Sequence, residues 1–397
     1  MSEQHAEREH QVRPLELLFD LVFVFAFTQV TTVLSGNPTW SGLGHGLLIL
    51  SALWWVWAAF AWLTNTLDAD AGAVWGTMLV AMAAMFIAAL AVPDAFGRHG
   101  VVFGVAFPIV NVMHLALYAL GARGDRDLFA AILRIAPMAL AGAALILAAG
   151  FVDGAVRPLL WLAALIVGLF GPLLSSISGW RVEPVHFIER HGLIVIIAIG
   201  ESLIAIGLGA QGTELNTGVI VAAVLGLVVV TSFWLAYFDF FPMRAQQLLT
   251  GRSGVQRTAL ARDVYTYLHL PMVAGIVLFA FAMKETLAHV GDELDTIPAL
   301  ALCGGPALYL FAYVALRFRV ARTLGGGRLV AAGTCALLSP VAVLLPALVA
   351  LALVAAVWVA LHLYEIVWWR DARAQTRALR AAVFPEGAPA SEIPPQA

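Results

Sequence analysis

Charge is scarce in this sequence. Only 12% of its 397 residues are Asp, Glu, Lys or Arg, and 61% are hydrophobic, whereas soluble domains carry about 25% charged residues. A soluble fold of this size would have to expose much of that apolar content, because its surface faces water. The composition therefore excludes an ordinary soluble protein and indicates a chain that folds in the lipid bilayer. The net charge of −3 supplies no basic face, so no nucleic-acid partner is expected.

Cysteine and metal-binding motifs are also nearly absent. The two cysteines, Cys303 and Cys335, lie in apolar segments and form no CxxC pair, and no two histidines have the HExxH spacing of a zinc site. We therefore expect no disulfide, no metal site and no cofactor. The polar stretch 1–13 lacks the apolar core of a cleavable signal peptide, which predicts that the first hydrophobic helix is retained as the insertion signal.

Long hydrophobic runs are what the sequence does contain. A helix needs about 20 mostly apolar residues to cross a bilayer, and twelve segments approach or meet this length. Pro340 and Pro346 interrupt the last apolar stretch, so one re-entrant element, and hence eleven spans, is the alternative. The sequence predicts an all-α polytopic membrane protein with about twelve spans, at 15–35, 42–63, 72–92, 100–121, 128–150, 158–179, 188–210, 217–241, 264–288, 297–317, 329–345 and 347–368.

The distribution of basic residues predicts which helix ends face the cytoplasm. Of the 22 Lys and Arg residues, 17 fall in segments on the side of the N-terminus, 2 (Arg98 and Arg157) fall on the other side, and 3 fall within spans. Positive residues accumulate on the cytoplasmic side of a membrane. We therefore expect both termini in the cytoplasm and a multi-pass protein of the bacterial inner membrane, with the lipid bilayer as its surroundings.

An internal repeat is the next feature. The segments Leu21–Gln29 and Leu193–Glu201 align without gaps, and Trp54–Trp57 resembles Phe233–Tyr237 at the corresponding place in the next helix. Chance likeness between apolar helices is the alternative. Six helices in each half would make both halves enter the membrane from the same side, which predicts two parallel six-helix repeats. The expected segments are a cytoplasmic N-terminal segment, the first repeat, a linker, the second repeat and a disordered cytoplasmic tail, at 1–14, 15–179, 180–187, 188–368 and 369–397.

Ionisable residues inside these spans are the functional candidates, because charges in lipid are costly and usually mark a site. Glu201 lies deep in the seventh span, while Glu16 and Asp20 share one face of the first. Arg190 lies some 16 Å from Glu201 along the same helix, so we expect it to pair instead with Asp20 or Glu16 across the repeat. The alternatives are interhelical hydrogen bonds and charges at helix ends. Further candidates for an ion or solute pathway are Gln29, Asn111, His114, Glu189, His191, Tyr237, Asp239 and His269.

Four sequence blocks resemble the bacterial low temperature requirement A (LtrA) family of membrane proteins. They are Arg13–Gln29, Phe187–Ser202, Trp234–Asp239 and Tyr267–Ile276, and the resemblance covers about residues 12 to 370. It implies an integral membrane protein linked by name to growth in the cold, with no substrate or reaction attached. The residues that match within the blocks are Arg13, Glu16, Asp20, Gln29, Glu189, Arg190, Gly192, Glu201, Tyr237, Asp239, His269 and Pro271.

Transport is the function that these features favour. A transporter or channel for a small ion or solute, coupled to protons through intramembrane carboxylates, predicts that Asp20 and Glu201 line a cavity. A membrane-embedded enzyme acting on lipid would place its polar cluster at one membrane face, and no residue is assigned a catalytic role. A structural or sensory protein of membrane state, linked to growth in the cold, predicts carboxyls that are buried and paired. Assembly into a homo-oligomer is left open.

Overall fold

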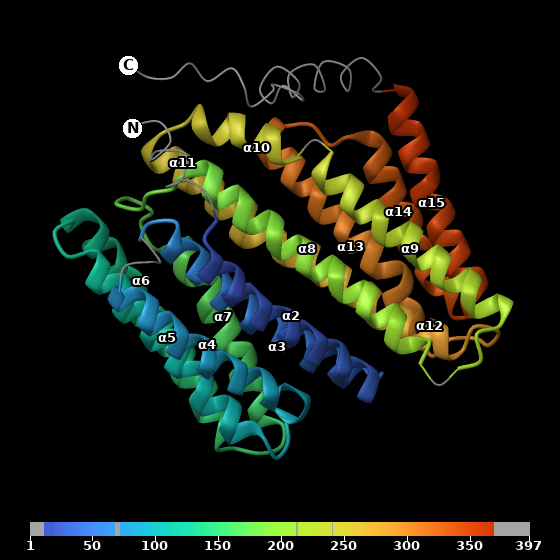
Figure 1. The fold of residues 1–397 in the computed structure, drawn as a ribbon, viewed down its shortest axis with the longest axis horizontal. Coiled ribbons are helices and arrows are strands. Elements are labelled where there is room, and N and C mark those ends of the chain that lie inside the picture. The colour runs from blue at the N-terminus through green and yellow to red at the C-terminus, as the bar shows by residue number, and fades with distance from the viewer. Residues whose placement is uncertain (1–11, 68–71, 212, 240, 369–397) are drawn as a thin grey trace, which may run out of the picture.

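The fold is entirely helical within the described ranges. The structure, a computed structural model, describes residues 12–67, 72–211, 213–239 and 241–368. No β-strand occurs in these ranges. The predicted tail, 369–397, and most of the predicted N-terminal segment lie outside the described residues. Figure 1 shows the long helices running side by side in two groups, as a membrane bundle requires, because only helices or closed barrels satisfy backbone polar groups in lipid.

The first group contains the N-terminal helices. Side chains cap two of its helices: Thr39 accepts a hydrogen bond from the Gly42 amide, and Asp125 accepts one from the Leu128 amide. Such caps satisfy amides that a helix start leaves without partners. The helices are α2 (Pro14–Gly36), α3 (Trp40–Thr64), α4 (Gly72–Ala91), the short η1 (Val92–Asp94), α5 (Gly100–Gly121), α6 (Arg126–Gly150) and α7 (Val156–Leu174).

The second group contains two features that the predicted spans did not include. The predicted span 217–241 ends at Phe238, and two short helices follow it at one end of the bundle (Figure 1). Before the next long helix, the chain winds as a π-helix, a rare form that occurs frequently at functional sites. The elements are α8 (Pro184–Gly209), α9 (Thr217–Phe238), α10 (Phe241–Thr250), α11 (Gly254–Ala261), η2 (Arg262–Leu268), α12 (His269–Ala288), α13 (Thr296–Ala321), α14 (Gly326–Ala342) and α15 (Ala347–Trp368).

The count of helices agrees with a multi-pass membrane protein. In the described ranges, 11 helices are long and apolar enough to cross a membrane. The predicted span 329–345 corresponds to α14, which has 17 residues and is about 26 Å long, slightly less than the hydrocarbon core of about 30 Å. α14 and α15 are separate helices that pack on each other, so both predicted elements of this stretch exist.

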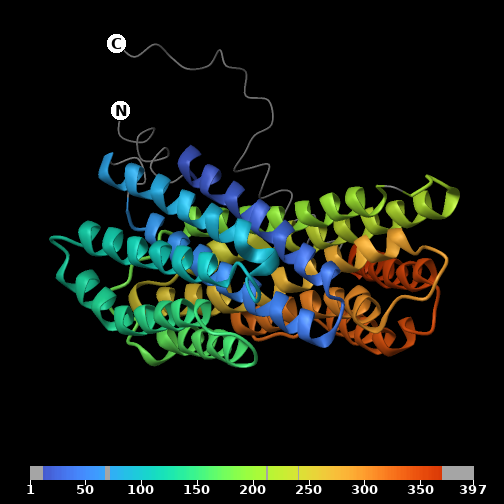
Figure 2. The same ribbon diagram turned by 90° about the horizontal axis from the view of Figure 1, so that it is seen from below.

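The helices of each half pack in a similar order. In the first half α2 packs on α4, α4 on α5, α5 on α6, α6 on α7, and α3 reaches α7. In the second half α8 packs on α12, α12 on α13, α13 on α14, α14 on α15, and α9 reaches α15. Figure 2, turned by 90°, shows the two groups lying along one another. Most helix contacts between the halves come from α2 and α3 on one side and α8 and α12 on the other, and hydrogen bonds that join η2 to α3 and α7 add to them.

Two ends of the bundle are distinguished by charge. We call the end that carries most of the arginines the basic face, and the other end the opposite face. The basic face includes the loops at 122–125, 175–183, 251–253 and 322–325. The opposite face includes the loops at 37–39, 151–155, 210–216, 289–295 and 343–346.

Candidate functional site

α2 and α8 run parallel through the middle of the molecule, and we call their contact the seam. Polar contacts along it join partners that are 170 to 173 residues apart, from Glu16 with His186 near the basic face to Thr28 with Glu201 further in. Such a nearly constant separation requires that the two helices run in the same direction. Figure 1 shows α2 and α8 side by side between the two groups. The seam therefore joins the halves through polar side chains.

Four buried residues form a charged cluster at the basic-face end of the seam: Glu16, Asp20, His186 and Arg190. The Arg190 guanidinium donates to Asp20 Oδ2 at 3.0 Å and lies 3.8 Å from Glu16 Oε1. The other Asp20 oxygen accepts from the Trp57 indole at 2.9 Å. Arg190 has no exposed surface, and Glu16 and Asp20 are 1% and 2% exposed. The structure confirms the predicted pairing of Arg190 with Asp20 across the two halves.

The hydrogen bonds around His186 assign its tautomer. Asn65 accepts from the Glu183 amide through Oδ1, so its Nδ2 donates, to the Glu183 carbonyl and to His186 Nδ1. His186 Nε2 therefore carries the hydrogen and donates to Glu16 Oε2 at 2.9 Å. With a neutral His186, the charged cluster contains two carboxyl groups and one guanidinium. With both carboxyls ionised, the cluster has one more negative charge than positive charges, and one bound proton would balance it. Such balance matters because an unpaired charge is costly where water is excluded.

Glu201 occupies a second buried position in the seam, about 16 Å further along α8. Its side chain has no exposed surface. One oxygen accepts from the Thr28 hydroxyl at 2.5 Å, and the other accepts from the Thr31 hydroxyl at 2.7 Å. Both donors belong to α2, so a carboxyl of one half is held by hydroxyls of the other. Hydroxyls carry no charge, and among the ion pairs of the described residues none involves Glu201.

The π-helix η2 helps to build a buried group of aromatic and histidine rings next to the seam: His191, Tyr237, Tyr265 and His269. His269 Nδ1 donates to the Val264 carbonyl five residues earlier, which is the spacing of a π-helix, and its Nε2 accepts from the Tyr237 hydroxyl at 2.9 Å. Tyr265 stacks on His269 with ring centroids 4.7 Å apart and meets His191 at the same distance. We call these four residues the ring cluster.

Several buried polar atoms between the charged cluster and the ring cluster have no hydrogen-bond partner among the described residues. They are Arg190 Nε and Nη2, His191 Nε2, Tyr265 Oη and Glu16 Oε1. Buried polar atoms are nearly always paired in native proteins, so this concentration makes the region a candidate site. No group of three or more His, Cys, Asp or Glu side chains in the described part of the chain could hold a metal ion.

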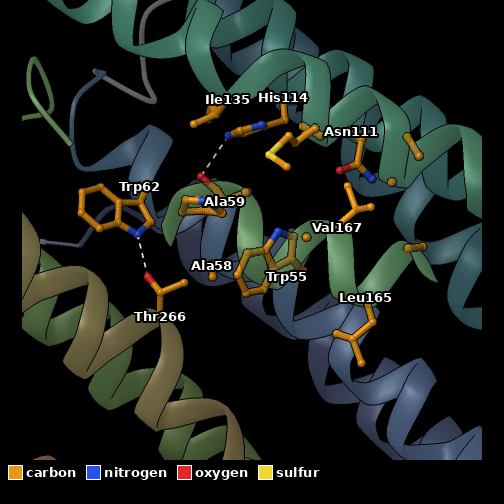
Figure 3. Close-up of a pocket in the computed structure, with 18 of the residues that line it drawn as sticks. Trp55, Ala58, Ala59, Trp62, Asn111, His114, Ile135, Leu165, Val167 and Thr266 are labelled. Atoms are coloured by element: carbon orange, nitrogen blue, oxygen red, sulfur yellow. Dashed lines mark hydrogen bonds between the residues drawn. The ribbon is translucent and has the colours of Figure 1, made fainter. Parts of the chain in front are cut away.

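A cavity of about 160 Å³ lies outside the seam, mainly among helices of the first half, and Thr258, Arg262 and Thr266 of the second half also line it. α3, α5, α6 and α7 pack on one another in a ring around it, and we call it the four-helix cavity. Figure 3 shows Asn111 and His114 from α5 on one side and Trp55 and Trp62 from α3 on the other. His114 Nε2 donates to the Ala59 carbonyl, and the Trp62 indole donates to the Thr266 hydroxyl of η2.

The four-helix cavity extends toward the basic face, and a second hollow adjoins it. Ser175, Trp180 and Arg262 line the cavity near the basic face. The second hollow is lined by Trp40 and Pro158, at the starts of α3 and α7 on the opposite face. The two hollows share the lining residues Leu48, Ser51 and Leu165. Together they reach from one face of the bundle to the other.

The structure groups the predicted site residues in three places. Glu16, Asp20, Arg190 and Glu201 lie in the seam. His191, Tyr237 and His269 lie in the ring cluster, and Asn111 and His114 line the four-helix cavity. Gln29 is half-buried on α2, Glu189 is exposed on α8, and Asp239 is half-buried at the end of α9. Neither Asp20 nor Glu201 lines either hollow. In this conformation Asp20 and Glu201 are therefore buried and hydrogen-bonded, as a structural or sensory protein predicts. They do not line either hollow, although the transport hypothesis predicted that they would line a cavity.

Sequence reasoning missed several residues of these sites. Thr28 and Thr31 hold Glu201; the repeat alignment paired Gln29 with Glu201 as equivalent positions and predicted no contact for either threonine. A threonine inside an apolar helix is common, so composition gave no signal. A second buried ion pair joins Arg328 on α14 to Glu365 on α15 at 2.6 Å. Both residues lie near helix ends, where the sequence indicates ordinary surface charge.

Comparison with known proteins gives one family and one relative. A family model described as bacterial low temperature requirement A protein (LtrA) matches residues 11–363. An uncharacterized protein, RA0937, of Rhizobium meliloti (strain 1021) is 32% identical over 307 residues, which is 74% of each chain. No solved structure gives a significant match. The matched range includes the seam, the ring cluster and the four-helix cavity.

Proposed function

The chain belongs to the bacterial low temperature requirement A family, and from this premise we propose that it transports a small ion or solute across the bacterial inner membrane, with coupling to protons. That it is a multi-pass membrane protein follows from the family and from its 11 apolar helices of spanning length. The placement of the basic face in the cytoplasm is part of the proposal.

The observation that supports transport most directly is the pair of adjoining hollows. The four-helix cavity reaches residues at the basic face, and the second hollow reaches residues at the opposite face. They meet near Leu48, about 12 Å from the start of α3. Two hollows that reach opposite faces and share lining residues offer a route for a solute, and alternating access would need them to open in turn.

Proton coupling is supported by the seam. One bound proton would balance the charge of the charged cluster, and among the described residues the hydrogen bonds to the Glu201 carboxyl come from hydroxyl donors. Adding or removing a proton at the charged cluster or at Glu201 changes the electrostatic attraction and the hydrogen bonds between α2 and α8. Intramembrane carboxyls that join two halves of a bundle are the usual proton-binding groups of transporters.

The similar packing order of the two halves supports the internal repeat. In each half the first helix packs on the third, the next three pack in series, and the second reaches the sixth. The first helices of the two halves meet in the seam and run parallel, as equivalent elements of a parallel repeat would. We propose that the chain consists of two such six-helix repeats.

A structural or sensory function is the second candidate, and one observation favours it. Asp20 and Glu201 are buried, hydrogen-bonded and away from both hollows. Carboxyls in this arrangement strengthen helix contacts whether or not anything is transported.

Flux in sealed proteoliposomes separates the two functions. A pH-sensitive dye is trapped inside, potassium, sodium and proton gradients are imposed in turn, and thermal unfolding confirms the fold of each variant. We expect Glu201→Gln to lower proton-coupled flux at least tenfold, because the amide cannot bind the transported proton. Glu214→Gln, the same change at an exposed loop residue, serves as the control and should leave flux unchanged. Normal flux in folded Glu201→Gln protein would contradict the coupling. Absence of any wild-type flux would show that none of these three ions is transported alone.

A further inference from the structure

We infer that the four-helix cavity binds a small uncharged ring compound that carries a hydroxyl group, a phenol or a benzyl alcohol in chemical class. This site deepens the proposed function by naming the class of solute, although binding itself needs no gradient. The inference rests on the size of the cavity, the chemistry of its wall and the pairing with Asp263 of Arg262, the one charged side chain among its described lining residues.

The size of the cavity fits one ring. Its volume is about 160 Å³, and an apolar cavity of about 150 Å³ in another protein is known to hold benzene. The space exists because α6 and α7 present small residues to it. A Cβ on Gly142 would meet only the Ala164 carbonyl oxygen, at 3.7 Å, so a larger side chain there would grow into the cavity. The small residues lining it are Ala52, Ala58, Ala59, Ala139, Gly142, Ala143, Ala164, Gly168 and Gly171.

Aromatic side chains form much of the remaining wall. Trp55 and Trp62 come from α3, Phe107 from α5, Trp161 from α7 and Trp180 from the loop at the basic face. Such rings offer flat apolar surfaces and positive edges, which favour stacked or edge-on contact with another ring. An aromatic or alicyclic ligand therefore fits this wall better than a flexible polar one.

Two acceptors on α5 give the cavity its polarity. His114 donates through Nε2 to the Ala59 carbonyl at 3.1 Å, so in the neutral ring Nδ1 is an acceptor. Asn111 donates through Nδ2 to the Phe107 carbonyl at 3.0 Å, which leaves its amide oxygen as an acceptor. Both residues line the cavity (Figure 3). The Trp55 indole lies on the α3 side of the cavity, where a Cβ on Gly168 of α7 would lie 3.3 Å from its Nε1. A hydroxyl group can donate to the acceptors and accept from the indole.

The charges near the cavity argue for an uncharged ligand. Arg262 lines it at the basic-face end, where it is bound to Asp263 at 2.7 Å and to the Pro172 carbonyl at 3.0 Å. The other lining side chains of the described chain are apolar or carry hydroxyl, amide or imidazole groups. Moving a carboxylate or an ammonium ion into such a site without a counter-charge costs more free energy than its contacts return.

Fluorine NMR of 4-fluorobenzyl alcohol, with the protein in nanodiscs, measures this binding. Gly142→Leu fills the cavity and should weaken saturable binding at least tenfold. The control, Gly333→Leu, makes the same change on α14 where a Cβ meets nothing within 4 Å, and should bind as the wild type does. Both variants contain the same lipid, so partitioning of the probe into the bilayer cancels in the comparison. Thermal unfolding shows that each variant is folded.

The hydroxyl specificity has its own comparison. Asn111→Leu should weaken binding of 4-fluorobenzyl alcohol about five- to tenfold, the value of one hydrogen bond, and should leave binding of 4-fluorotoluene unchanged. Equal affinity for the alcohol, the toluene and 4-fluorobenzoate would overturn the inference, and so would normal binding by folded Gly142→Leu protein. Stronger binding of the toluene would assign the cavity to an apolar chain, such as a lipid tail. Because no gradient is used, this result stands or falls separately from the flux assay.

Discussion

Replacement of Arg190 by methionine is the sharpest test of the charged cluster. Arg190 is fully buried and is the guanidinium that faces both Glu16 and Asp20. Arg190→Met leaves two buried carboxyls with neutral His186 as their neighbour. Asp20→Asn instead leaves one carboxyl and one guanidinium, which balance each other. The two substitutions remove one charge each, but only the first leaves the cluster further from neutrality.

The expected costs follow from this charge count. Removing one partner of a buried ion pair costs about 3–5 kcal/mol of unfolding free energy, and we expect Arg190→Met to fall in that range. Asp20→Asn loses charge-assisted hydrogen bonds to Arg190 and Trp57, each worth about 1.5–3 kcal/mol. Because the same change leaves one carboxyl balanced by one guanidinium, part of this loss is offset. We therefore expect Asp20→Asn to lower the unfolding free energy less than Arg190→Met does. The double variant should cost less than the sum of the single ones by about 1–3 kcal/mol, because its two sites share one interaction.

Unfolding in mixed micelles by increasing SDS, followed by tryptophan fluorescence, gives the free energies. The deficit of Arg190→Met should shrink as the pH is lowered, because protonation of a carboxyl removes the negative charge that Arg190 had compensated. A loss below about 1 kcal/mol for Arg190→Met, or a larger loss for Asp20→Asn than for Arg190→Met, would refute the charge count.

Two further substitutions test the packing of the second half. Arg328→Met should lower the unfolding free energy by about 3–5 kcal/mol, measured in the same SDS titration, because it leaves Glu365 buried without its 2.6 Å partner. Gly275→Ala should lower the melting temperature, because a Cβ there would lie 2.5 Å from the Gly305 carbonyl oxygen and would push α12 from α13. Gly200→Ala, where a Cβ meets nothing within 4 Å, is the control, and an equal melting temperature for both alanine variants would contradict this account.

Most of the fold was accessible from the sequence because lipid imposes a simple rule. Every predicted span corresponds to a helix, since an apolar run of this length has few other stable forms in a bilayer. Helix ends were less accessible. α8 begins at Pro184 rather than 188, and the predicted span 217–241 stops at Phe238 before α10 and α11. Hydropathy changes gradually at these places, whereas the helix end depends on proline and on local packing.

The site was only partly accessible. The rarity of charge in lipid pointed to Asp20, Arg190 and Glu201, and the pairing of Arg190 with Asp20 follows from their similar depth in parallel helices. The partners of Glu201 did not follow, because the contact of Thr28 and Thr31 with it depends on the rotation of α2 about its axis. Hydropathy alone does not fix that rotation when a helix is apolar on all sides.

The seam and the four-helix cavity are separate places, so coupling between them needs a physical connection, and α3 provides one. Its Trp57 donates to Asp20 in the charged cluster, while Trp55 and Trp62 line the cavity. Trp62 is also bound to the Thr266 hydroxyl of the π-helix, which lies next to the ring cluster. A proton that neutralises Asp20 weakens its bond to Trp57 and thereby changes what holds α3 against the seam. Two sites are energetically coupled when both of them influence the position of one structural element. With Trp57 on the side of the seam and Trp55 and Trp62 on the side of the cavity, α3 is the element through which proton and solute would be coupled under the proposed function, without contact between them.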